Sequence, residues 1–190
     1  MLIIKNQSYQ RKIVMFRIQI SPSLALELLD LPHAAALFEL TSKNREFLAR
    51  WLPWVGFIQH ITDTEKFIQA TKQQWASGNG FQCAIIDQEQ LAGIIGFHEF
   101  NRINDSASVG YWLGEQYQGK GLIQQSLPVL IRQAFERYSI QRIVIRCAVD
   151  NHKSRKIPAK LGFHLEGILK ANEKLHGEYV DQAIYSLIKP

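Results

Sequence analysis

Two glycines flank a lysine near the middle of this chain, in the segment Gln118-Gly119-Lys120-Gly121-Leu122-Ile123. The alternation of small and large side chains over residues 107–113 predicts a strand before it, and helical spacing of apolar residues to about Tyr138 predicts a helix after it. The first N–H groups of a helix have no partner within the helix, and the helix dipole favours negative charge there. Gly119 and Gly121 would allow close approach of a ligand and a positive φ, while Lys120 would add a positive charge. The segment therefore predicts a binding site for a phosphate-bearing ligand.

The spacing of these glycines excludes two common phosphate loops. A P-loop requires the pattern Gly-x-x-x-x-Gly-Lys-Ser/Thr, which the chain does not contain. The dinucleotide-binding fingerprint would require a third glycine at position 124, which is a glutamine. A glycine-rich connection that binds no ligand stays an alternative, because paired glycines are common in turns.

The segments around the turn predict an α+β domain. We expect a strand near Met15–Ser21, helices over about 31–52 that break near 41–44, and a helix to about Ser77 with Thr62 as N-cap and Glu65 completing a capping box. Further along we expect strands at 81–87, 91–100 and 107–114, a helix at 120–138, a strand at 141–149, a short helix at 154–161 and two strands between 163 and 188. This order predicts a mixed sheet with one βαβ crossover in the middle. Pro128 and Pro158 lie within predicted helices, which we expect to persist with a bend.

Length and composition predict one soluble globular domain over residues 1–190, because 46% of the residues are hydrophobic and 21% are charged. The longest apolar runs, such as residues 92–97, are far too short to span a bilayer, and the segment Met1-Leu2-Ile3-Ile4-Lys5 lacks the order of a signal peptide. We therefore expect a cytoplasmic protein with no membrane partner. Cys83 and Cys147 lie in apolar runs and are expected to be buried free thiols. The histidines show no metal-ligand spacing, so no metal is expected.

The formal net charge of +5 is compatible with nucleic acid or with a small polyanion as partner. Basic residues are spread along the chain, and the dense cluster Lys153-Ser154-Arg155-Lys156 lies at the start of a predicted helix. A small polyanion fits a local cluster better than a nucleic-acid duplex does, so direct nucleic-acid binding is not expected.

The C-terminal half resembles the GNAT N-acetyltransferases in the order and spacing of four motifs. These are Gly110-Tyr111-Trp112-Leu113, Gln118-Gly119-Lys120-Gly121, Asn151-x-x-Ser154 and Leu161-Gly162-Phe163-x-x-Glu166-Gly167. Together with residues 44–54, they resemble the RimJ/RimL branch of ribosomal-protein alanine/serine N-acetyltransferases, and the resemblance covers about residues 16–187. The chain departs from the family at Ile123, where glycine or alanine is usual, and at Pro128. The resemblance implies a mixed, mostly antiparallel sheet of about seven strands with a central βαβ crossover and flanking helices.

The resemblance also implies acetyl-CoA as donor and a primary amine as acceptor, which attacks the thioester directly. The coenzyme contacts that it implies are Trp112, Leu113, Gln118, Gly119, Lys120, Gly121, Leu122, Ile123, Asn151, Ser154 and Lys156. The strand at Trp112 and Leu113 would pair with the pantetheine arm, and N–H groups of residues 118–123 would bind the pyrophosphate. The Asn151 amide would bond the pantetheine or cap a helix, and the two roles can coexist.

Ser154 matches the serine implied as general acid toward the coenzyme sulfur, with a helix cap as the alternative. Glu173 matches the acidic residue implied as general base, with a solvated strand carboxylate as the alternative, and His98 is an alternative base. An α-amine with a pKa near ~8 needs less help than a lysine near ~10.4, so a weak base suits an N-terminal amine.

The leading interpretation is an acetyl-CoA-dependent N-acetyltransferase for the α-amine of a protein or peptide N-terminus. A ribosomal-protein acceptor and a homodimer are implied by the branch. Two alternatives stay open: acetylation of a small amine (a polyamine, amino sugar or amino-acid-like compound), and a non-catalytic acyl-CoA-binding regulator, which Glu173 and Ser154 facing away from the groove would favour. Cys147 could approach the coenzyme thiol or be structural, Trp51 and Trp54 are expected in the core or a cleft wall, and Asp181 could orient substrate or make a structural hydrogen bond.

Overall fold

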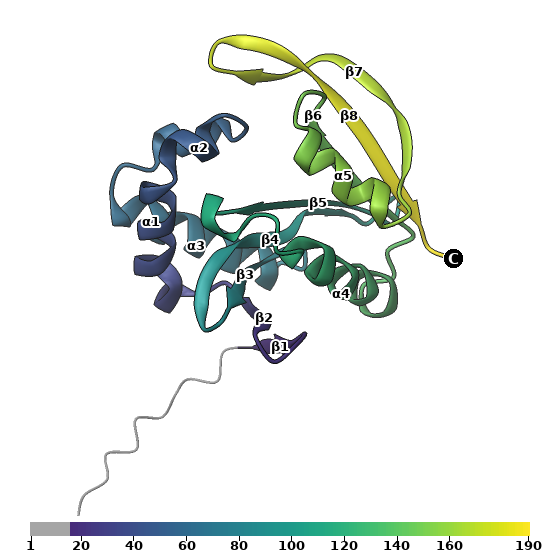
Figure 1. Cartoon of the computed structure of the whole chain (residues 1–190). Helices are drawn as coiled ribbons and strands as arrows, with labels where there is room; N and C mark the ends of the chain where they lie inside the picture. Colours follow the sequence, from purple (N-terminus) through teal and green to yellow (C-terminus); the bar gives the residue numbers. More distant parts are fainter. Residues whose placement is uncertain (1–15) are drawn as a thin grey trace, which may run out of the picture.

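The computed structural model describes residues 16–190, so the segment Met1–Lys5 and residue Met15 of the first expected strand lie outside the described part of the chain. Eight strands form one sheet in the order β1-β2-β3-β4-β5-β6-β8-β7, and every neighbouring pair except β5 and β6 is antiparallel (Figure 1). The expected mixed, mostly antiparallel sheet is confirmed, with one strand more than the predicted seven.

The strands are β1 (Arg17–Gln19), β2 (Leu24–Leu28), β3 (Phe81–Asp87), β4 (Gln90–Asn101), β5 (Ser106–Leu113), β6 (Arg142–Ala148), β7 (His164–Leu175) and β8 (Glu178–Ile188). The helices are α1 (Ala34–Lys43), α2 (Arg45–Ala49), α3 (Ile61–Ala76), α4 (Leu122–Arg137) and α5 (His152–Lys160), with the 3-10 turns η1 (Leu31–His33), η2 (Pro53–Phe57) and η3 (Glu115–Tyr117).

Strand β2 is the element that the sequence did not reveal. Its residues, Leu-Ala-Leu-Glu-Leu, are good helix formers. Pairing with both β1 and β3 buries Leu24, Ala25 and Leu26, so tertiary contacts override the local propensity.

Helix α3 begins earlier than expected, and Thr62 is not its N-cap. His60 occupies the N-cap position, and the Asp63 carboxylate accepts hydrogen bonds from the backbone N–H groups of His60 at 2.9 Å and Gln59 at 3.0 Å. These bonds hold the pKa of the Asp63 carboxyl below its usual value. Asp63 therefore has the capping-box role predicted for Glu65, because it lies three residues after the true N-cap.

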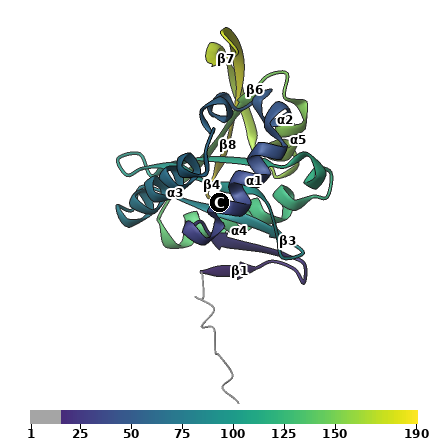
Figure 2. The same cartoon turned by 90° about the vertical axis from the view of Figure 1, so that its left-hand side faces the viewer.

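Helices cover both faces of the sheet and create two cores (Figures 1 and 2). Helix α4 packs on one face, and α1 and α3 pack on the other. Strand β5 contributes to both cores, because successive side chains of a strand point to opposite faces. Tyr111 packs against the α4 core, and Trp112 packs against the α1/α3 core.

Helix α4 joins the parallel strands β5 and β6, which confirms the predicted βαβ crossover. These strands pair only at their starts, where Ser106, Ala107 and Ser108 oppose residues 142–144. Beyond this point β5 and β6 are not paired with each other. Residues from the end of β5 line both cavities described below, and residues from the end of β6 line one of them. Helices α4 and α5 persist across Pro128 and Pro158, as predicted.

Strands β7 and β8 form a hairpin at the sheet edge that arches over α5 toward α2 (Figure 1). At its tip, the Nε2–H of His176 donates a hydrogen bond to the carbonyl of Ala49 at 2.7 Å, which joins the hairpin to the end of α2. Between the pairs Leu169–Gln182 and Glu173–Val180, β7 has three residues (170–172) and β8 has only Asp181, so β7 bulges here. The Asp181 carboxylate fixes this bulge, because it accepts hydrogen bonds from the Ala171 N–H at 2.9 Å and from Lys170 at 2.8 Å.

Within residues 16–190, no helix is both long and apolar enough to cross a membrane.

Candidate active site

The glycine segment forms the N-terminus of α4. Gly121 is the N-cap with a φ of 73°, and Gly119 has a φ of 76°, both in the left-handed region that favours glycine. The Gln118 N–H donates to the Glu115 carbonyl at 3.1 Å, whereas no described group accepts a hydrogen bond from the N–H groups of residues 119–124. These free donors lie at the positive end of the helix dipole, as an anion site requires.

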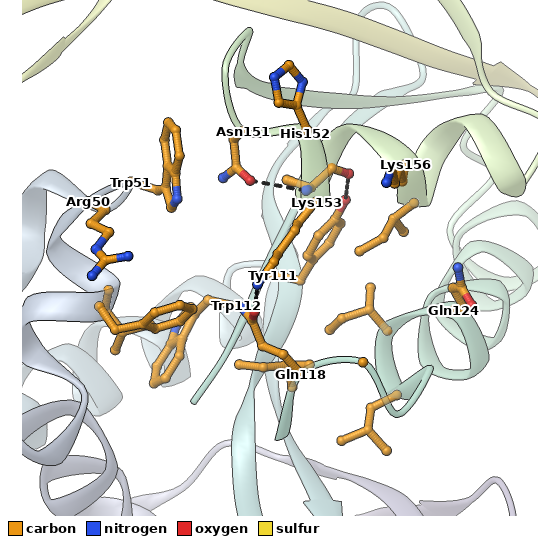
Figure 3. Close-up of a pocket in the computed structure, with 18 of the residues that line it drawn as sticks. Arg50, Trp51, Tyr111, Trp112, Gln118, Gln124, Asn151, His152, Lys153 and Lys156 are labelled. Atoms are coloured by element: carbon orange, nitrogen blue, oxygen red, sulfur yellow. Dashed lines mark hydrogen bonds between the residues drawn. The ribbon is translucent and has the colours of Figure 1, made fainter. Parts of the chain in front are cut away.

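A cavity of about 910 Å³, here called the coenzyme cavity, lies beside this terminus between α4, α5 and the end of β5 (Figure 3). It is lined by nearly all residues predicted to bind the coenzyme: Trp112, Leu113, Gln118, Gly119, Gly121, Leu122, Ile123, Asn151, Ser154 and Lys156. Four basic side chains line it, Arg50, Lys153, Lys156 and Lys160, and one carboxylate, that of Asp150. The surplus of positive charge suits a ligand with several phosphates.

Lys120 does not line the coenzyme cavity. Its ammonium pairs with the Asp87 carboxylate at 3.2 Å and lies 5.0 Å from the centre of the Tyr117 ring. Lys120 therefore ties the glycine turn to the end of β3, and its direct contact with a phosphate stays a prediction.

Helix α5 presents different residues to the cavity and to the sheet. The cavity is lined by lysines at positions i, i+3 and i+7 of this helix: Lys153, Lys156 and Lys160. Because this spacing places them on one helix face, it could have predicted Lys160 as a further cavity residue. Arg155 holds the helix to the sheet, because it donates to the Tyr185 hydroxyl and to the Val149 carbonyl, both at 3.0 Å. Lys153 Nζ donates to Gln118 Oε1 at 2.8 Å, which links α5 to the glycine turn (Figure 3).

Asn151 is the N-cap of α5, since its side chain accepts a hydrogen bond from the Ser154 N–H at 3.1 Å. The capping role is confirmed for Asn151 rather than for Ser154. Both residues also line the coenzyme cavity, so the cap leaves their other polar atoms available to a ligand.

A second cavity of about 680 Å³, here called the acceptor cavity, lies between the sheet and the helices α1 and α3. The two cavities share one wall, formed by Trp51, Leu52, Tyr111, Trp112, Asn151 and Ser154. Trp51 and Trp54 are cleft-wall residues, as expected, and the Trp54 ring centre lies 5.8 Å from that of Trp112.

Glu173 lines the acceptor cavity, in the direction that the catalytic interpretation requires. Its carboxylate accepts a hydrogen bond from the Gln182 amide at 2.9 Å, and Gln182 in turn accepts one from Asn172 at 2.7 Å. The bulge in β7 places Glu173 opposite Val180, two residues from Gln182 and on the same sheet face. Because Glu173 and Ser154 both face a cavity, the condition that would favour a non-catalytic regulator is not met.

His98 lies in the wall of the same cavity, where desolvation lowers the pKa of its imidazole. A neutral imidazole can accept a proton at pH 7. The ring lies directly over Gly110, since a Cβ built on Gly110 would be 2.1 Å from His98 Nε2. Two candidate bases, Glu173 and His98, therefore face one cavity.

Cys83 and Cys147 are buried free thiols, as predicted. Burial raises the pKa of Cys83 to about 12 and also raises the pKa of Cys147. Cys147 lines the acceptor cavity, as Ser154 does.

Tyr111 is a wall residue whose position the sequence analysis did not anticipate. Its hydroxyl donates to the Ser154 carbonyl at 3.2 Å, and burial raises the pKa of this phenol (Figure 3). The group therefore stays a protonated O–H where the two cavities meet. Its place in the motif Gly110-Tyr111-Trp112-Leu113 was the available signal.

Among residues 16–190, no cluster of three or more His, Cys, Asp or Glu side chains could hold a metal ion.

The fold and the site together agree with one known family. Residues 23–164 match the acetyltransferase (GNAT) domain, and the chain belongs to that family. It is an N-acetyltransferase that uses acetyl-CoA.

Proteins of known sequence and structure resemble nearly the whole chain. The ribosomal-protein-serine acetyltransferase of Escherichia coli (strain K12) is 36% identical over 171 residues, covering 90% of this chain and 96% of its own. A solved RimL ribosomal L7/L12 α-N-protein acetyltransferase, in complex with coenzyme A that forms a disulfide with one of its cysteines, superposes with a TM-score of 0.88 at 35% identity, covering 90% of this chain and 97% of its own. The Microcin C7 self-immunity acetyltransferase MccE, solved with acetyl-CoA and AMP, superposes with a TM-score of 0.87 at 31% identity, covering 90% and 96%.

Proposed function

We propose that the enzyme transfers the acetyl group of acetyl-CoA to the α-amine of a protein or peptide N-terminus. The observation that carries the proposal is the meeting of two cavities at one wall. One has the free N–H groups and lysines that suit a polyanionic coenzyme, and the other has an oriented carboxylate and a neutral imidazole. Resemblance to an enzyme named for acetylating ribosomal-protein serine supports a ribosomal-protein N-terminus as acceptor.

In this mechanism the pyrophosphate binds the N–H groups of residues 119–124 and the lysines of α5. The unpaired edge of β5 at Trp112 and Leu113 binds the pantetheine arm by β-type hydrogen bonds and polarises the thioester carbonyl. Glu173 accepts a proton from the attacking amine, directly or through water, as the new N–C bond forms. Ser154 donates its hydroxyl proton to the coenzyme sulfur as the S–C bond breaks, then regains a proton from water while Glu173 releases its proton to water.

The wall shared by the cavities also supports a place for the coenzyme thiol near Cys147. Cys147 lines the same cavity as Ser154, the proposed proton donor to that sulfur. In one solved relative, coenzyme A forms a disulfide with a cysteine of that protein, so a cysteine can lie beside the coenzyme thiol in this family.

Thiol release from acetyl-CoA, followed with Ellman's reagent, tests the proposal against N-terminal peptides, lysine peptides, polyamines and amino sugars. Turnover of the N-terminal peptides, with mass spectrometry placing the acetyl group on the α-amine, is the expected result. Turnover restricted to small amines would overturn the acceptor class. That second candidate is supported by the relative MccE, which is named for self-immunity to Microcin C7.

Replacing Glu173 by glutamine tests the base. The amide keeps the shape and a hydrogen bond to Gln182, so we expect unchanged acetyl-CoA affinity and about 100-fold slower turnover. His98→Gln is the matched variant, because both residues line the acceptor cavity. If His98→Gln loses turnover and Glu173→Gln keeps it at every pH, the base is His98.

We further propose that residues 1–190 act as one cytoplasmic domain and that the protein is a homodimer. Free buried thiols support a reducing compartment. The accessible edge strand β7, with exposed Leu165, Ile168 and Leu169, supports self-association. Light scattering coupled to size exclusion measures the oligomeric state.

A further inference from the structure

We propose that the acceptor carries a carboxylate close to its reacting amine and that Arg146 binds this group. The proposal rests on the proposed function and names the class of N-terminus that the site prefers: a peptide with an acidic residue at its third, fourth or fifth position.

Arg146 lies in the acceptor cavity and outside the coenzyme cavity. It belongs to β6, where it pairs with Ile184, while Ala148 two residues later pairs with Gln182. Paired residues of antiparallel strands share a face, so Arg146 lies on the face of Gln182 and of Glu173. Arg146 lies opposite Ile184 and Glu173 lies opposite Val180, four positions apart on β8, so strand geometry separates them by about 13 Å along the strands.

The Arg146 guanidinium has no partner among residues 16–190. The ion pairs and side-chain hydrogen bonds of that part of the chain engage the guanidinium groups of Arg17, Arg45, Arg102, Arg142 and Arg155 but leave Arg146 out. The one carboxylate of the acceptor cavity, Glu173, is held instead by the Gln182 amide.

The surroundings strengthen attraction for an anion. Three tryptophans (Trp51, Trp54 and Trp112) and Phe67 supply apolar walls, and a charge pair is stronger where water is displaced. A guanidinium offers a planar fork of donors that matches a carboxylate in bidentate geometry. Arg146 therefore suits a carboxylate better than any neutral group.

The spacing identifies where on the acceptor this carboxylate lies. An extended peptide advances about 3.3 Å per residue, so about 13 Å along the strands corresponds to about four residues. With the amine at Glu173, an acidic side chain at the third, fourth or fifth position reaches Arg146. The free C-terminus of a tetrapeptide would supply the same chemistry from another source.

The test uses amidated peptides that differ only by aspartate or asparagine at the third, fourth or fifth position. The wild-type enzyme is expected to show a kcat/KM about 10–100-fold higher for the aspartate peptide at one of them, the size of one charge-assisted hydrogen-bonded pair. In Arg146→Gln this ratio falls to about 1, and in Arg146→Lys it is intermediate. The ratio stays at its wild-type value in the control Arg132→Gln, whose exposed side chain lies on α4 outside both cavities. A tetrapeptide with a free carboxylate, compared with its amide, shows whether a C-terminus serves as well.

Equal use of aspartate and asparagine peptides by the wild type would overturn the proposal. So would an aspartate preference that survives in Arg146→Gln. If no peptide is acetylated, the proposed function fails, and calorimetry of the same peptides with the protein–CoA complex then decides the anion site by itself. Tighter binding of the aspartate peptide that requires Arg146 supports the site, and equal or undetectable binding refutes it.

Discussion

The glycine turn allows a test in which stability and ligand binding can be separated. Gly121 and Gly162 have nearly the same backbone, with φ of 73° and 79°, but only Gly121 lines the coenzyme cavity. A Cβ added at Gly162 meets no atom within 4 Å, and one added at Gly121 meets only Gln124 and Gln125, at 3.8 Å. Alanine therefore causes the same backbone strain and no clash at either position.

Because the backbone strain is the same, the two alanine variants should lose the same stability and differ only in acetyl-CoA affinity. An alanine in the left-handed region costs about 1–2 kcal/mol, partly offset by a less flexible unfolded chain, so each variant should lose about 1 kcal/mol of stability. For a chain of this length that is a fall in Tm of about 2–4 °C. Because Gly121 lines the coenzyme cavity, we expect its new methyl group also to separate a phosphate from its N–H donors. Losing one hydrogen bond to a charged group, about 1.5–3 kcal/mol, raises the Kd for acetyl-CoA about 10–150-fold.

Differential scanning fluorimetry measures the first quantity and isothermal calorimetry with acetyl-CoA the second. Gly162→Ala should match Gly121→Ala in Tm and match the wild type in Kd. If Gly121→Ala binds acetyl-CoA as tightly as Gly162→Ala does, the N–H groups of this turn are not the phosphate site.

Two further predictions concern a cap and an ion pair. Asn151→Ala removes the N-cap of α5, so its free energy of unfolding should fall by about 1 kcal/mol and it should bind acetyl-CoA more weakly. Asn151→Asp keeps a capping oxygen, so it should restore the stability but not the acetyl-CoA affinity. Thermal unfolding and calorimetry separate the effects, and wild-type affinity in Asn151→Asp would limit Asn151 to capping. Hydrogen bonds from Arg142 and Ser186 lower the pKa of Glu166 to about 2. This stabilisation is complete above the unfolded pKa of about 4.3 and is lost as pH falls through about 2, so wild type and Glu166→Gln should converge in urea midpoint between pH 5 and 2.5. A constant difference across that range would contradict the assignment.

The parts of the fold and site that were predictable from sequence are those set by local residues. Gly119 and Gly121 adopt the positive φ that makes glycine necessary, and Asn151 caps its own helix. Strand β2 could not be predicted, because its residues favour a helix until β1 and β3 bury them.

The positions of Arg146 and Glu173 could not be predicted either, for a different reason. Both depend on the register of distant strands, and Glu173 also depends on a bulge held by Asp181. Lys120 shows the same limit, since its proximity to Asp87 arises only when β3 and the glycine turn come together.

The short pairing of β5 with β6 also has a consequence for unfolding. Antiparallel pairing is continuous from β1 to β5 and again from β6 through β8 to β7, but only residues 106–108 and 142–144 join the two blocks in register. Local unfolding follows boundaries that few backbone hydrogen bonds cross, so the block of β6, β8 and β7 should open first, together with α5. A ligand that contacts α4 and α5 at once holds the blocks together and raises the free energy of that opening. Occupancy of the coenzyme cavity should therefore raise the cooperativity with which the whole sheet unfolds, because the two blocks otherwise pair only at residues 106–108 and 142–144.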